Sequence, residues 1–103
     1  MTEVADSVAG ATKPRLLFFY ESSDGKARRV EGYLAQVLQR RRNHETFVIH
    51  RVDVEQRPEL AERFNIEATP TFVVVQDKRI RGQLERPRNA VEIQHLLTPW
   101  LRR

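Results

Sequence analysis

Side chains that could carry out covalent or metal chemistry are few and scattered along this chain. The histidines are His44, His50 and His95, and there is no cysteine. None of the histidines stands at a spacing typical of a metal site. Ser22 and Ser23 could act as nucleophiles only beside a base and a group that orients it, and the sequence indicates no such partner for them. We therefore expect no metal, no cofactor and no serine or cysteine catalysis.

The missing cysteines exclude disulfides, thiolate nucleophiles and thiolate-bound zinc together. A cysteine-free chain also fits a reducing compartment. No apolar run approaches the ~18 residues that span a bilayer, and the first residues lack the basic and apolar segments of a signal peptide. The sequence therefore predicts a cytoplasmic protein with no membrane contact.

The formal net charge is +4, from 18 basic and 14 acidic residues. A positive balance can indicate an acidic partner such as nucleic acid, an acidic protein or anionic lipid. Interspersed charges of both signs favour a simpler interpretation, a solvated surface. Tyr33 and Trp100 fall on helix stripes that face the core, so few aromatic side chains remain to stack on bases, and we do not expect nucleic acid as a partner.

The apolar patterns predict an α/β fold with the element order βαβαββα. The continuous apolar run 16–20 predicts a strand buried on both faces. Apolar residues at helical spacing over 30–38 predict a helix. Asp24 is expected as its N-cap, and Gly25 would ease the turn into it. The helix is expected to end in Arg40, Arg41 and Arg42, whose positive charge suits the negative end of the helix dipole. Residues 1–13 show no periodicity and are expected to be a tail, with one domain at 14–103.

The second half of the chain continues the alternation. Residues 46–54 predict a strand, Pro58 opens a short helix ending at a left-handed Asn65, and strands at 71–75 and 79–84 flank a tight turn at 76–78. We expect the last strand to be an edge, with Ile80, Gly82 and Leu84 on one face. A helix capped by Asn89 and Glu92 completes a four-stranded mixed sheet flanked by helices.

This order, together with Ala68-Thr69-Pro70-Thr71-Phe72 and with the segment from Val52-Asp53-Val54 to Phe64-Asn65-Ile66, resembles the thioredoxin family. The resemblance runs from about Arg15 to the C-terminus. It implies a thioredoxin-like fold in which the bond before Pro70 is cis. It also implies a peptide-binding groove beside that proline.

The chain departs from the family where redox chemistry takes place. Asp24-Gly25-Lys26-Ala27 stands where the resemblance places the Cys-Gly-Pro-Cys motif. Ser23 replaces the preceding tryptophan, and Phe18 replaces the buried aspartate that assists proton transfer. Thiol–disulfide exchange needs two thiols, so we expect no enzyme activity from this pseudo-active site.

A second resemblance leads to a different class of function. Residues 52–54, 58–61, 68–71 and 79–84 are also similar to KaiB and to KaiB-like sensor domains, which lack the cysteine pair and bind protein partners. An ordinary hairpin around Gln76 to Lys78 favours the thioredoxin resemblance over this one.

The expected function is that of a non-catalytic module that binds a protein or peptide. The thioredoxin resemblance implies a backbone platform at Thr69 and Pro70 that pairs with an extended ligand. Asp24, Gly25 and Lys26 would form one wall of the groove, and Arg86 the other. Lys26, Arg28, Arg29 and Arg86 would make the groove basic and suit an acidic segment. A partner subunit of an oxidoreductase is a further alternative.

Overall fold

The computed structural model describes residues 13–102. Its strands are β1 (Arg15–Tyr20), β2 (Val48–Asp53), β3 (Thr71–Gln76) and β4 (Arg79–Glu85), and they form a four-stranded sheet in the order β2-β1-β3-β4. β1 pairs with β2 in parallel and with β3 antiparallel, and β3 pairs antiparallel with β4. The mixed α/β sheet and the edge position of β4 confirm the fold class predicted from the sequence. Most of the tail expected at 1–13 lies outside the described residues.

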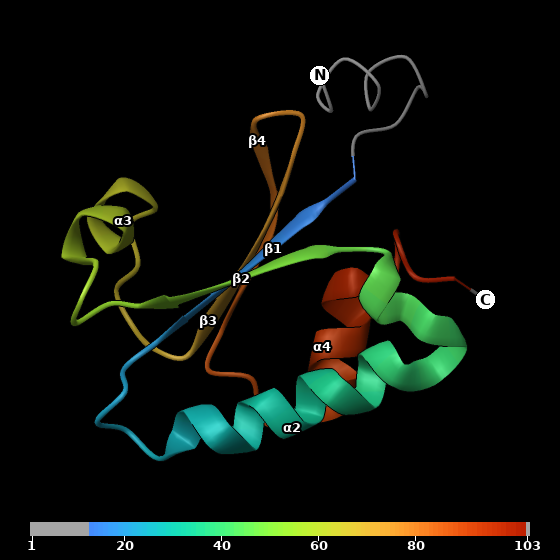
Figure 1. Cartoon of the computed structure of the whole chain (residues 1–103), viewed down its shortest axis with the longest axis horizontal. Coiled ribbons are helices and arrows are strands. Elements are labelled where there is room, and N and C mark those ends of the chain that lie inside the picture. The colour runs from blue at the N-terminus through green and yellow to red at the C-terminus, as the bar shows by residue number, and fades with distance from the viewer. Residues whose placement is uncertain (1–12, 103) are drawn as a thin grey trace.

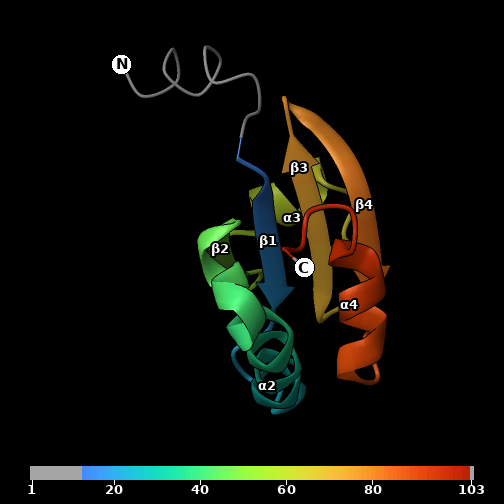
Figure 2. The same cartoon turned by 90° about the vertical axis from the view of Figure 1, so that its right-hand side faces the viewer.

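The helices cover both faces of this sheet (Figure 1). They are α2 (Lys26–Gln39), α3 (Pro58–Arg63) and α4 (Ala90–Leu97), with a short 3₁₀ segment η1 (Arg40–Glu45) after α2. Figure 2 shows α2 and α4 on one side of the sheet and α3 on the other. Among the described residues, no helix is long and apolar enough to cross a membrane.

Two apolar layers hold the sheet between the helices. The larger layer lies under α2 and α4 and contains Leu16, Phe18, Leu34, Phe72 and Ile93, all at most 2% exposed. The smaller layer, under α3, is centred on Phe19, Val52 and Val73. Because β1 and β3 contribute to both layers, their sequences read as continuous apolar runs rather than alternating ones.

The β3–β4 hairpin closes through Asp77 and Lys78, whose φ angles are 54° and 64°. Positive φ at both central residues is typical of a type I′ turn, whose twist matches that of the flanking strands. The predicted tight turn is confirmed. Asn65, with φ 54°, likewise takes the left-handed conformation expected after α3.

The prediction that Ile80, Gly82 and Leu84 share one face of β4 is wrong for Ile80, in the first half of the strand. Val74 lies opposite Gly82, whereas Val75 lies opposite Ile80, so Arg81 is an extra residue in the strand. This bulge reverses the alternation, and Ile80 is 54% exposed on the α3 side of the sheet. Gly82 instead faces α4.

The predicted end of the first helix is also wrong. α2 ends at Gln39, and Arg40 begins the η1 segment. Arg41 and Arg42 have φ angles of 54° and 55°, which interrupts the helical path. The three arginines therefore form an irregular turn rather than the last turn of α2.

The last helix begins as predicted. The Asn89 Oδ1 atom accepts a hydrogen bond from the Glu92 N–H at 3.0 Å, and the Glu92 carboxylate accepts one from the Arg88 N–H at 2.7 Å. After α4 ends, Trp100 still packs against the core, and its indole N–H donates to the Gln76 side chain at 3.0 Å.

Candidate functional site

The sheet topology brings three separate segments to one corner of the molecule. β1 and β2 are parallel, so the loops that follow Tyr20 and Asp53 lie at the same end of the sheet. β3 runs antiparallel to β1, so β3 starts at that end of the sheet, and the loop that leads into Thr71 lies there too. The corner therefore combines residues 21–27, Glu55, and residues 67–70, with Arg86 arriving from the end of β4.

Thr69 and Pro70 lie at the centre of this corner. Their peptide bond is cis. Pro70 is buried, and its carbonyl accepts a hydrogen bond from the Arg86 N–H at 2.7 Å. Thr69 is half-buried, and within residues 13–102 its backbone N–H and C=O have no hydrogen-bond partner. The structure thus brings Thr69, Pro70 and Arg86 together.

Two glutamates that the sequence analysis did not single out hold the loops of this corner. The Thr69 hydroxyl donates to the Glu21 carboxylate at 2.7 Å, which ties the loop after β1 to the loop before β3. Glu55 accepts from the hydroxyls of Ser22 and Ser23 at 3.1 Å and 3.2 Å, and from the Ser23 N–H at 3.3 Å. The signal for Glu55 was its position just after β2, which the parallel pairing places beside the loop after β1.

The pseudo-active site forms the start of α2, with one difference from expectation. Gly25 is the residue directly before α2, but its φ of −64° and ψ of −14° are already helical, so the capping bond comes from Asp24. The Asp24 carboxylate accepts from the Lys26 N–H at 3.0 Å, while its carbonyl accepts from the Ala27 N–H at 3.3 Å. Gly25 has φ −64° and open space where a Cβ would lie, so the turn does not require a glycine there.

Phe18 lies in the apolar layer behind this corner. It is 1% exposed, and its ring stacks on Phe72 with centroids 4.8 Å apart and on Tyr20 at 5.6 Å. An ionisable group could not occupy this position without losing these contacts and its hydration. The interior beside the pseudo-active site is therefore a packed aromatic cluster.

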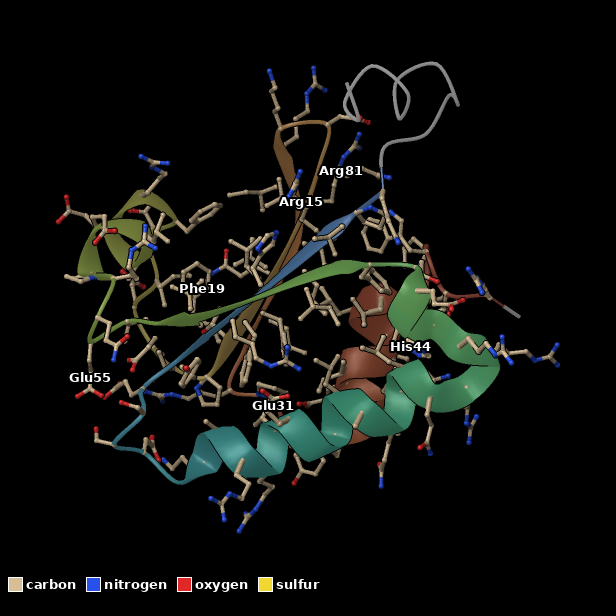
Figure 3. All side chains as sticks on the ribbon, in the orientation of Figure 1. Arg15, Phe19, Glu31, His44, Glu55 and Arg81 are labelled. Carbon is tan, nitrogen blue, oxygen red and sulfur yellow. The ribbon has the colours of Figure 1, made fainter. Side chains whose placement is uncertain are left out.

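The polar side chains that bond to one another in this corner are carboxylates and hydroxyls, whereas Lys26 and Arg86 are exposed. The Ser22 and Ser23 hydroxyls donate to a glutamate, and the corner contains no histidine that could serve as their base. Figure 3 shows Glu55 and His44 at opposite ends of the molecule, and His50 contacts Arg15 with its Nε2 atom 3.2 Å from the guanidinium. Within residues 13–102, no group of acidic and histidine side chains could hold a metal ion.

Charged residues of both signs lie in or next to the segments that form this corner. Lys26, Arg28 and Arg29 are exposed on the first turns of α2, and Arg86 is exposed beside Pro70. Within the described part of the chain, none of these four forms a salt bridge. The Glu21 carboxylate, however, lies against Thr69 itself, so the charged residues at this corner are not basic alone.

Comparison with known proteins agrees with this geometry. The family model described as Thioredoxin matches residues 2–99. No curated protein matches the chain. The germline-specific thioredoxin Deadhead of Drosophila melanogaster is 20% identical, with a TM-score of 0.74 over 98% of this chain and 94% of that one.

Two further solved structures have the same fold. The thioredoxin of Fasciola hepatica is 18% identical, with a TM-score of 0.74 over 97% of this chain and 91% of that one. Mitochondrial thioredoxin 3 of Saccharomyces cerevisiae is 19% identical, with a TM-score of 0.72 over 95% and 88% of the two chains. The chain contains no cysteine, and so it lacks the thiols on which thiol–disulfide exchange depends. On the evidence of the family match and the fold, the chain belongs to the thioredoxin family, and it contains no cysteine.

Proposed function

We propose that this domain is a non-catalytic binding module that holds an extended protein or peptide segment against Thr69. The observation that carries the proposal is the unpaired backbone of Thr69. Its N–H and C=O have no partner within residues 13–102, although the residue is half-buried beside the sheet. Backbone groups in such a position favour a partner, and an extended ligand would supply both bonds as a short added strand.

The loops around Thr69 are already held in place. Glu21 fixes the Thr69 side chain, Glu55 fixes Ser22 and Ser23, and the Arg86 N–H fixes the Pro70 carbonyl. A surface held in its binding conformation loses less conformational entropy when a ligand arrives. These contacts support binding by a rigid platform.

The exposed side chain of Arg86 would orient the bound ligand by its charge. This side chain forms no salt bridge in the described part of the chain, whereas Glu21 occupies the position next to Thr69. A ligand with an acidic residue on the Arg86 side and none over Glu21 would match both charges. This modifies the expectation of a groove that is basic throughout.

Selection from a phage library of short linear peptides, followed by fluorescence anisotropy with the full chain, tests the proposal. We expect Thr69→Trp to fill the platform and weaken the selected peptide by at least about tenfold, or about 1.4 kcal/mol. His95→Trp is the control, because His95 is exposed on α4 and belongs to none of the segments that form the corner. Circular dichroism would verify that both variants fold.

The peptide backbone offers a second readout. If the ligand pairs with Thr69 as a strand, N-methylation of one peptide residue should abolish binding, and methylation of its neighbours should not. Equal affinity of wild type and Thr69→Trp, or tolerance of N-methylation at every position, would contradict the proposal.

The alternative of an oxidoreductase partner subunit makes a different prediction. Our proposal expects that the chain alone does not raise insulin reduction above the rate of dithiothreitol, and that it does not change the rate of an added cysteine-bearing thioredoxin. Acceleration of the added thioredoxin would favour the alternative. The KaiB-like resemblance and the cytoplasmic location remain predictions, and cell fractionation would check the second.

A further inference from the structure

A second recessed surface lies at the other end of α2. The end of this helix, the η1 turn, α4 and the segment after α4 enclose a groove of about 870 Å³. Figure 1 shows these segments gathered on the side of the C-terminus, away from the loop that joins β1 to α2. We call this surface the arginine groove, and its principal residues are Val37, Arg40, Arg41, Val91, Gln94 and Leu101.

The charge of the arginine groove has one sign. Its lining contains Arg40, Arg41 and Arg102 and no acidic residue. Arg102 has a partner in Glu45, with a nitrogen-to-oxygen distance of 3.4 Å. Arg40 and Arg41 form no salt bridge with any residue in 13–102. Two uncompensated guanidinium groups at the mouth of one groove favour an anionic ligand.

The backbone that presents these arginines is strained and firmly held. Arg41 and Arg42 are consecutive residues with φ of 54° and 55°, a conformation that glycine or asparagine adopts at lower cost. The buried Asn43 maintains it, because its side chain bonds to the Arg40 carbonyl at 2.7 Å and to the Arg102 N–H at 2.6 Å. Strain of this kind persists where surrounding contacts impose it, and it is concentrated at functional sites of proteins.

Part of the groove lining is apolar and lies beside the polar side chains of Gln36, Gln94 and Thr98. Val91 is 54% exposed on α4. Among the described residues, the other large apolar side chain with such exposure is Ile80, which lies in β4. Val37 from α2 and Leu101 extend this apolar surface between the two helices. Apolar side chains exposed between two helices can receive the apolar face of a third helix.

We propose that the arginine groove binds an amphipathic helix of a partner protein, with apolar residues over Val91 and acidic residues over Arg40 and Arg41. Apolar contact would supply affinity, and charge complementarity would supply orientation. This surface is separate from the platform at Thr69 and takes a helical ligand rather than an extended one.

A display library of helical peptides with a fixed leucine stripe tests the proposal. The positions that flank the stripe are randomised among Glu, Gln and Lys, and the full chain is the bait. We expect enrichment of Glu over Lys on one side of the stripe. The enriched peptide is then measured against wild type and variants by fluorescence anisotropy at fixed salt.

Arg41→Gly and Arg42→Gly form a matched pair of variants. Both remove one exposed arginine at positive φ, but only Arg41 lines the groove. Both should raise the midpoint of thermal unfolding, because glycine relieves the strain. We expect Arg41→Gly to weaken the helical peptide by about fivefold or more and Arg42→Gly by less than about twofold.

The following results would each overturn the proposal. Enrichment of Lys, or absence of any helical binder, would show that the groove does not select an acidic helix. Equal weakening by the two glycine variants would indicate non-specific attraction to net charge. If Thr69→Trp lost binding of the helical peptide while Arg41→Gly kept it, the ligand would lie at the platform instead. If the platform proposal failed, the expected binding of the helical peptide to these variants would not change.

Discussion

Asn43 connects the most irregular turn of the chain to its C-terminal segment. The residue is 2% exposed, and its side chain takes part in four hydrogen bonds, with the Arg40 carbonyl, the Thr46 hydroxyl and both backbone groups of Arg102. A buried amide with all its polar atoms satisfied is stabilising, whereas its removal leaves several backbone groups without partners.

We expect Asn43→Ala to lower the free energy of unfolding by about 2–3 kcal/mol, because the Arg40 carbonyl and the Arg102 N–H would lose their buried partner. Denaturant unfolding measures this change. Gln39→Ala is the control, since Gln39 is exposed on the same stretch of chain and should change stability by less than about 0.5 kcal/mol. A similar small loss in both variants would mean that Asn43 does not hold the turn.

At the scale of elements, β4 and α4 meet at a glycine. A Cβ added to Gly82 would lie 2.9 Å from the Leu96 Cδ1 atom, closer than two carbon atoms approach without one of them moving. Because the obstacle is the end of a flexible side chain, Leu96 could rotate away at the cost of its packing.

Gly82→Ala should therefore destabilise the domain by about 1 kcal/mol, and adding Leu96→Ala should remove most of this penalty. Gly25→Ala is the matched control. Gly25 has φ −64° and no atom within 4 Å of its would-be Cβ, so the same substitution should stabilise the domain by about 0.4–1 kcal/mol. Thermal unfolding of the four variants gives the comparison. Additive effects of the Gly82 and Leu96 substitutions would contradict the proposed contact.

Elements with a strong local signal were predictable from the sequence. The run at Arg15–Tyr20, the stripe of α2, the turn at Asp77 and the cap at Asn89 each depend on neighbours in the chain, and each is confirmed. The bulge at Arg81 was not predictable, because strict alternation of Ile80, Gly82 and Leu84 is also what a regular strand would show.

The end of α2 and the two glutamates that hold the corner could not be predicted, because both depend on contacts between residues far apart in the sequence. Arg40, Arg41 and Arg42 have good helix propensity, and the interruption depends on Asn43 bonding to Arg102, far along the chain. Glu21 and Glu55 have no distinguishing local pattern, and their roles follow only from which strand ends the sheet places side by side.

For the whole molecule, the two proposed surfaces lie at opposite ends of α2. The corner at Thr69 carries Glu21 and Glu55 close to its centre, while Arg40 and Arg41 border the groove at the other end. α2 has 14 residues, so at ~1.5 Å per residue it separates the two surfaces by about 20 Å. The net charge of +4 is therefore less informative than its distribution.

The proposed function depends most on Thr69 serving as the platform for an extended ligand. Amide chemical shifts of the full chain, followed by NMR during titration with the phage-selected linear peptide, test it directly. We predict saturable shifts centred on Ala68, Thr69 and Arg86, and none of comparable size at Arg41 or Val91. Shifts confined to the arginine groove, or no shift at Thr69 at saturating peptide, would contradict the account.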